Sequence, residues 1–167
     1  MFVNEPVSNY PSITDVNFTP IHKKYLKVIL WNVVLIFSVI LAGLFLADYF
    51  NVFEEISSYV SFFYMAFTLV FISIILIKFW GFKKRKYAVR EKDISYKSGI
   101  LFKKQTTVPF SRIQHLEIDE GPISRFFKLA SLSVYTAGDS SDDLVIKGMS
   151  KKTALEIKEF ISQKINE

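Results

Sequence analysis

The chain has 167 residues, half of them hydrophobic, with 17 Phe, 8 Tyr and no Cys. The absence of Cys excludes disulfides, thiolate metal sites and cysteine nucleophiles, and the apolar content exceeds what a soluble domain of this length needs. The formal net charge of +5 is unevenly placed, because residues 1–81 hold four basic and five acidic side chains whereas residues 82–167 hold 17 and 11. An apolar half is therefore followed by a basic half.

The first 24 residues have the composition of an irregular tail, with three Pro among scattered Asn, Ser and Thr. Two charge-free apolar segments follow, one beginning at Val28 and the other at Ile56. About 20 apolar residues in a helix cross a hydrocarbon core, and a helix satisfies its own backbone polar groups there. The sequence therefore predicts a transmembrane hairpin over residues 25–80, with helices at about 27–48 and 56–79.

The Lys and Arg residues predict the orientation of this hairpin. The connecting residues 48–55 include none, whereas Lys23, Lys24 and Lys27 precede the first helix and a basic run follows the second. Because basic residues remain on the cytoplasmic side, we expect a multi-pass protein of the cytoplasmic (inner) membrane with both termini in the cytoplasm. Neither apolar segment contains Asp, Glu, Lys, Arg or His, which disfavours a channel or transporter.

Beyond residue 82 the apolar pattern takes the two-residue period of strands. The predicted strands are 87–90, 94–98, 100–108, 113–119, 132–136 and 143–147. Gly99 suits a tight turn, Pro109 ends its strand, and residues 123–129 predict one or two helical turns.

The chain finishes with an amphipathic helix. Ser150 is its expected N-cap, and Ala154, Ile157, Ile161 and Ile165 recur at helical spacing. Several strands closed by one helix predict a small α+β domain over residues 83–167.

Five motifs in this half occur in a distinctive order. They are YAVREKDI at 87–94, SGIL at 98–101, VPFSRIQHL at 108–116, GPISRFFKLA at 121–130 and TAG at 136–138. Their order and spacing resemble the bacterial pleckstrin-homology (PH)-like domains, and more narrowly the YdbS/YdbT group of membrane proteins.

The resemblance implies an α+β fold in which a two-helix transmembrane hairpin precedes a PH-like bent antiparallel sheet of about seven strands, capped by a C-terminal α-helix. It also implies a non-enzymatic module that assembles with related PH-domain membrane proteins, as a homo- or hetero-oligomer, and serves envelope maintenance or stress tolerance. The alternative function is binding or sensing of anionic lipid headgroups.

Two groups of basic residues are candidates for lipid contact. The membrane-interface cluster consists of Lys83, Lys84, Arg85 and Lys86. It either fixes the topology or attracts anionic headgroups, at about 1 kcal/mol per basic residue. Lys103 and Lys104 lie beside a hairpin that resembles the ligand-facing loops of eukaryotic PH domains, and they form either a lipid site or a solvated turn.

Arg112 and Gln114 are candidate binding residues in the SRIQ segment. Arg112 would pair with Glu117 or Asp119, or would recognise a partner protein. His115 shares a strand face with the two carboxylates, which is either a general base with its orienting group or a solvated surface. We expect the surface, and hence no catalytic residue.

Metal, cofactor and nucleic-acid sites are not expected. Asp139, Asp142 and Asp143 lack the spacing of a Ca²⁺ loop and suit a polar turn. The sequence contains no phosphate-cradling Gly-rich loop, HExxH motif or nucleophile motif, and no RNA- or DNA-binding motif.

Overall fold

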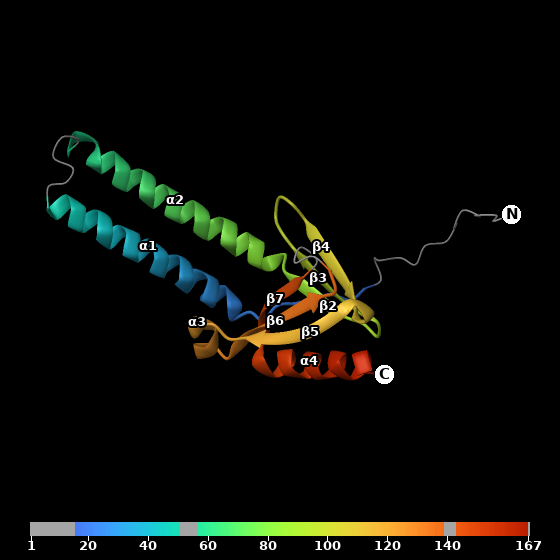
Figure 1. Cartoon of the computed structure of the whole chain (residues 1–167). Coiled ribbons are helices and arrows are strands. Elements are labelled where there is room, and N and C mark those ends of the chain that lie inside the picture. Colours follow the sequence, from blue (N-terminus) through green and yellow to red (C-terminus); the bar gives the residue numbers. More distant parts are fainter. Residues whose placement is uncertain (1–15, 51–56, 139–142, 167) are drawn as a thin grey trace.

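The computed structural model describes residues 16–50, 57–138 and 143–166. Helix α1 (Tyr25–Tyr49) and helix α2 (Ser57–Lys83) form an antiparallel hairpin that projects from a compact β-rich domain (Figure 1). Both helices are long and apolar enough to cross a membrane, as predicted. Helix α2 continues past its expected end at residue 79, because no proline interrupts the residues that follow.

The domain contains two antiparallel sheets. The first has the order β1 (Thr19–Pro20), β2 (Lys86–Val89), β3 (Asp93–Ser98) and β4 (Lys104–Pro109), and the second has β5 (Ile113–Asp119), β6 (Leu129–Thr136) and β7 (Leu144–Ser150). The 3-10 turn η3 (Phe110–Arg112) joins the sheets, α3 (Pro122–Phe126) precedes β6, and α4 (Lys151–Asn166) follows β7. The α+β class and the strand count agree with the sequence prediction.

Two parts of the first sheet differ from the prediction. Strand β1 lies before the hairpin, in the segment that was expected to be irregular, and pairs Thr19 with Tyr87 of β2. The predicted strand at 100–108 begins only at Lys104. A loop replaces its first residues because Gly99 has a φ of +103°, and a Cβ there would overlap the carbonyl oxygen of Phe102.

The main core lies between the two sheets and α4. Ile94, Leu132, Ile146 and Ile161 are fully buried in it. The predicted cap of α4 is confirmed, because the Thr153 backbone N–H donates to Ser150 Oγ at 3.1 Å. The apolar face of α4 is shorter than predicted, since Ile165 is exposed.

A second core fastens the hairpin to the domain. We call it the junction core, and its buried members are Ile21, Tyr25, Val28 and Leu129. Tyr25, at the start of α1, lies against Gly148 of β7, which has a φ of +86° and no side chain to obstruct the ring. The His22 backbone N–H donates to the Gly148 carbonyl at 2.9 Å. The hairpin is therefore packed against the domain and also hydrogen-bonded to it.

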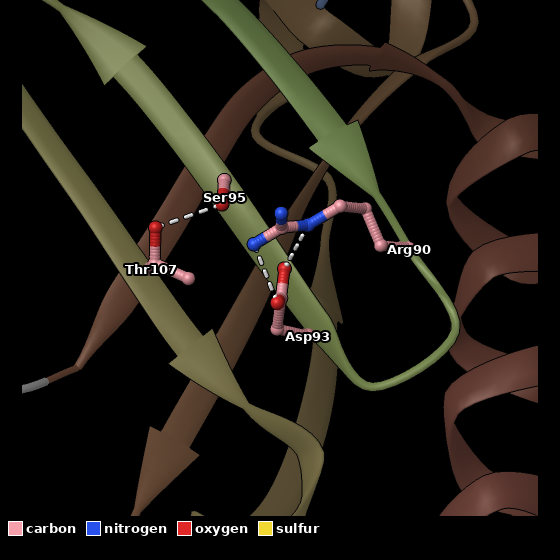
Figure 2. A network of polar contacts seen from close by, with 4 residues as sticks. All are labelled: Arg90, Asp93, Ser95 and Thr107. Carbon is pink, nitrogen blue, oxygen red and sulfur yellow. Dashed lines mark hydrogen bonds and ion pairs between the residues drawn. The ribbon is translucent and has the colours of Figure 1, made fainter. Parts of the chain in front are cut away.

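Polar contacts fix the register of the first sheet (Figure 2). Arg90 grips both carboxylate oxygens of Asp93 across the β2–β3 turn, from Nε at 2.8 Å and from Nη2 at 2.6 Å. The hydroxyls of Ser95 and Thr107 lie 2.8 Å apart between β3 and β4. Because a slip of one residue would turn every side chain to the opposite face, these contacts also fix which side chains share a face at the other end of the strands.

Candidate functional site

A basic pocket of about 680 Å³ lies at the end of the first sheet that is nearer the hairpin. Five lysines line what we call the lysine pocket: Lys84, Lys86, Lys97, Lys103 and Lys104. They come from the segment after α2, from β2, from β3 and from the start of β4 with the residue before it. No carboxylate lines the pocket within the described part of the chain.

Strand register brings these charges together. Lys86 of β2 lies directly opposite Lys97 of β3, and Ser98 of β3 lies opposite Lys104 of β4. Like charges that face each other across antiparallel strands destabilise a sheet. In the ranges that the structure describes, none of the five lysines forms an ion pair. The charges of the five lysines are therefore left unneutralised by ion pairs among the described residues.

Aromatic and backbone groups complete the lysine pocket. The Lys97 ammonium lies 4.5 Å from the centroid of the Phe18 ring, which contributes a cation–π contact. Gly99 and Lys103, at the two ends of the β3–β4 loop, also line the pocket. Each ammonium carries three N–H donors and no acceptor, so the pocket can offer many donors to one anionic group such as a phosphate.

The predicted interface cluster is divided between two directions. Lys84 and Lys86 line the lysine pocket. Lys83, the last residue of α2, instead lies 4.6 Å from the Phe79 ring, and the Arg85 guanidinium lies 5.9 Å from the Tyr25 ring. The chain turns between the end of α2 at Lys83 and the start of β2 at Lys86, and the four side chains therefore do not share one face.

The two other pairs of predicted binding residues fall in different places. Lys103 and Lys104 line the lysine pocket, whereas Arg112 in η3 and Gln114 in β5 are exposed elsewhere and are not among its described lining. Lys97 belongs to the site and was not predicted. The structure therefore brings together three separate lysine-bearing segments but not the SRIQ residues.

The carboxylates predicted to pair with Arg112 have other partners. Glu117 Oε2 accepts from the Tyr135 hydroxyl at 3.1 Å, and Asp119 Oδ2 accepts from the Ser133 hydroxyl at 2.9 Å. The hydrogen bond to Glu117 raises the pKa of Tyr135 above its usual value. Within the described ranges, the expected ion pair of Arg112 with Glu117 or Asp119 is not formed.

His115 lies on an open strand face. Its ring stacks on Tyr135 with centroids 4.2 Å apart, and its Nε2 is 3.8 Å from Glu117 Oε1. Asp119 bonds to Ser133 and does not orient the imidazole. The side chains of His115 and Glu117 are each more than half exposed, as in a solvated surface cluster.

The acidic turn is only partly described. Asp139 and Asp142 lie outside the described residues, and Asp143 Oδ1 accepts the Thr136 backbone N–H at 3.0 Å. Asp143 therefore satisfies the backbone N–H at the C-terminal end of β6. Within the described part of the chain, no three His or acidic side chains are grouped as a metal site would require.

Residues 24–165 match the family model of the bacterial PH domain. The chain belongs to the bacterial PH domain family. The match extends from the first turn of the hairpin to the end of α4 and confirms the resemblance predicted from the five motifs. Family membership, together with the two sheets and the terminal helix, establishes the PH-like fold class.

One sequence relative and one solved structure can be compared with this family member. It is 35% identical over 52 residues to the UPF0699 transmembrane protein YdbS of Bacillus subtilis (strain 168), which covers 31% of this chain and 33% of that protein. The match thus spans about a third of the relative's length. A crystal structure of a Shewanella loihica PV-4 protein with a pleckstrin-homology domain aligns with a TM-score of 0.38 and 20% identity, over 48% of this chain and 70% of that one.

Proposed function

We propose that this protein is a non-enzymatic, membrane-anchored PH module whose lysine pocket binds the phosphate of anionic lipid headgroups. The observation that carries the proposal is the convergence of five lysines without a carboxylate among the described lining residues. Two of them face each other across neighbouring strands, at a cost to the sheet that a bound anion would offset.

The position of the lysine pocket supports a lipid as the source of the phosphate. Lys84 directly follows Lys83, the last residue of α2. With the basic side of the hairpin in the cytoplasm, the pocket would face the headgroups of the inner leaflet of the cytoplasmic membrane. Basic residues close to an anionic leaflet each contribute about 1 kcal/mol of attraction.

The test compares two double variants of the full-length protein in detergent micelles. Lys97→Gln with Lys104→Gln removes two charges from the lysine pocket, and Lys152→Gln with Lys158→Gln removes two from α4. Phosphatidylglycerol and phosphatidylcholine are titrated separately, and native mass spectrometry counts the molecules retained.

The pocket variant should bind phosphatidylglycerol about 30-fold more weakly, which corresponds to about 2 kcal/mol for two charges. The α4 variant should bind it as the unsubstituted protein does, and phosphatidylcholine binding should be weak throughout. Equal retention of phosphatidylglycerol by both variants would refute a headgroup site in the lysine pocket. Unfolding in urea provides a control, because removal of the Lys86–Lys97 repulsion should not destabilise the domain.

A second function, assembly with related PH-domain membrane proteins, is supported by strand β4. This strand pairs with β3 alone and forms one edge of the first sheet. An edge strand presents unpaired backbone donors and acceptors that a strand of another protein can extend. Purification in mild detergent, followed by light scattering and identification of stoichiometric partners, tests this function. Recovery of a monomer without a partner would oppose it.

A further inference from the structure

The three most exposed large hydrophobic side chains of the described residues lie on the domain, outside the two membrane helices. Leu101 is 90% exposed, Phe102 is 89% exposed and Phe126 is 82% exposed, each more than any described side chain on the apolar surface of α1 or α2. Leu101 and Phe102 lie in the β3–β4 loop, and Phe126 is the last residue of α3. Apolar groups exposed to this degree mark a surface that contacts something other than water.

The β3–β4 loop lies beside the end of α2. A Cβ built on Gly81 would be 3.3 Å from Ile100 Cδ1, so Ile100 lies against the helix where Gly81 presents no side chain. Gly81 comes shortly after Lys78, the first charged residue beyond the apolar segment. The loop therefore reaches the helix at the level where α2 leaves the hydrocarbon.

Helix α3 lies beside the opposite helix of the hairpin. Asn32 and Leu35 of α1 line one small hollow together with Gly121, Pro122, Ile123 and Ser124. Leu35 lies about 10 Å along the helix axis from Val28, where the charge-free segment begins. Helix α3 is thus next to α1 at a depth that the apolar segment occupies within the bilayer.

The junction core fixes the β3–β4 loop and α3 in position relative to the hairpin. Tyr25 and Val28 of α1 are buried with Leu129 of β6, and Phe82 of α2 and Phe127 pack against them. Figure 1 shows the β3–β4 loop beside the end of α2 and α3 beside the start of α1, on two sides of the hairpin base. Whenever the hairpin crosses a bilayer, the loop and α3 must therefore meet the same bilayer surface.

We propose that Leu101, Phe102 and Phe126 embed in the interfacial layer of the bilayer that α1 and α2 cross, and so hold the domain against the membrane at two points. Basic residues flank both points, with Lys103 and Lys104 after the loop and Arg125 and Lys128 around Phe126. Apolar side chains next to cationic ones suit the boundary between acyl chains and headgroups. The membrane is the partner because both points are continuous with the surface of the membrane helices.

The absence of Cys from the chain makes a direct test possible. Single variants Phe102→Cys and Phe126→Cys of the full-length protein are labelled with the environment-sensitive fluorophore NBD. Ile165→Cys is the matched control, since Ile165 is an exposed apolar residue near the end of α4, on the side away from the hairpin (Figure 1). The labelled proteins are reconstituted into vesicles of phosphatidylcholine alone, so that no anionic headgroup contributes.

NBD at positions 102 and 126 should gain several-fold in intensity and shift to the blue on reconstitution. Phosphatidylcholine that carries a nitroxide near the headgroup should quench both labels, and the label at position 165 should show neither effect. Red-shifted emission without lipid quenching at positions 102 and 126 would overturn the proposal. A blue shift that lipid nitroxides leave unquenched would also overturn it, because a protein surface would then cover the site.

Far-ultraviolet circular dichroism of each labelled protein verifies that the domain is folded, and a label at Leu101→Cys replaces any variant that is not.

The outcomes of this experiment and of the lipid titration together separate the embedded surface from headgroup binding. Insertion in pure phosphatidylcholine combined with unchanged lipid retention by the Lys97 and Lys104 variant would support the embedded surface and refute the lysine site. No insertion in phosphatidylcholine combined with weaker phosphatidylglycerol retention by the Lys97 and Lys104 variant would refute the embedded surface and leave the lysine site standing.

Discussion

The packing of the Tyr25 ring against Gly148 allows a direct test of how the hairpin is attached to the domain. In Gly148→Ala, the new methyl group would overlap the Tyr25 ring carbons Cγ and Cδ1 and would lie 2.8 Å from Tyr25 Cβ. The backbone φ of +86° also strains any residue with a side chain. We expect the strained backbone to cost about 1–3 kcal/mol and the displaced ring about 1–3 kcal/mol more.

A double-mutant cycle separates these two costs. In a Tyr25→Ala background the ring is absent and only the close contact with the Cβ of residue 25 remains, so Gly148→Ala should retain mainly the cost of the strained backbone. The two substitutions should therefore be coupled by about 1–3 kcal/mol, the share of the displaced ring. Gly121→Ala is the control, because a Cβ there meets nothing within 4 Å and the φ is −64°.

Urea unfolding of the full-length protein in detergent micelles measures these free energies. Near-ultraviolet circular dichroism follows the domain while the apolar helices remain in the micelle. If Gly148→Ala costs the same in both backgrounds, the contact with the ring has no energetic role. If Gly148→Ala costs no more than Gly121→Ala, then neither the strained backbone at Gly148 nor the packing of the Tyr25 ring against it is as described.

Three further changes have defined outcomes. Gly99→Ala should destabilise the domain by about 1–3 kcal/mol in urea, because the φ of +103° and the Phe102 carbonyl both oppose a side chain; an unchanged midpoint would contradict the loop geometry. Ser150→Ala should cost about 1 kcal/mol through loss of the N-cap, whereas a neutral effect would mean that the cap is replaced. Glu117→Gln should lower the pKa of Tyr135. Tyrosinate absorbance is titrated in proteins with and without Tyr135→Phe, and the difference gives the titration of Tyr135 alone. Because folding raises this pKa, the Tyr135–Glu117 hydrogen bond stabilises the fold below about pH 10, the ordinary tyrosine value. This stabilisation is lost as the pH rises through the folded-state pKa of Tyr135. An identical titration after Glu117→Gln would refute the hydrogen bond as the cause of the raised pKa.

The elements that the sequence predicts well are those defined by local pattern. The two membrane helices follow from apolar length, and most strands of the second half follow from alternation. Strand β1 was missed because two residues, one of them Pro20, carry no periodicity and pair with a strand far along the chain. Residues 100–103 were predicted as strand because Ile100 and Phe102 favour strands, yet they form a loop beside α2 in which Leu101 and Phe102 are exposed.

The lysine pocket was predicted in part. Lys84 and Lys86 were selected for their position next to the membrane, and Lys103 and Lys104 because their hairpin resembles the ligand-facing loops of eukaryotic PH domains. Lys97 was missed because its role depends on strand pairing. The predicted strands at 87–90 and 94–98 would place Lys86 opposite Ser98, whereas the observed register places it opposite Lys97. Arg112 and Gln114 were selected from a motif, and nothing in the motif defined which end of the sheet they occupy.

The position of β1 has a consequence for how the protein is made. The whole hairpin is inserted between two neighbouring strands, because β1 precedes α1 and β2 follows α2. Closing a flexible loop as long as residues 21–85 would cost about 4 kcal/mol from the length term alone, whereas two helices side by side in a bilayer bring Pro20 and Lys86 together in advance. A chain in which α2 failed to insert would leave β1 and β2 on opposite sides of the membrane. The first sheet can therefore be completed only when both ends of the hairpin lie on the same side of the membrane.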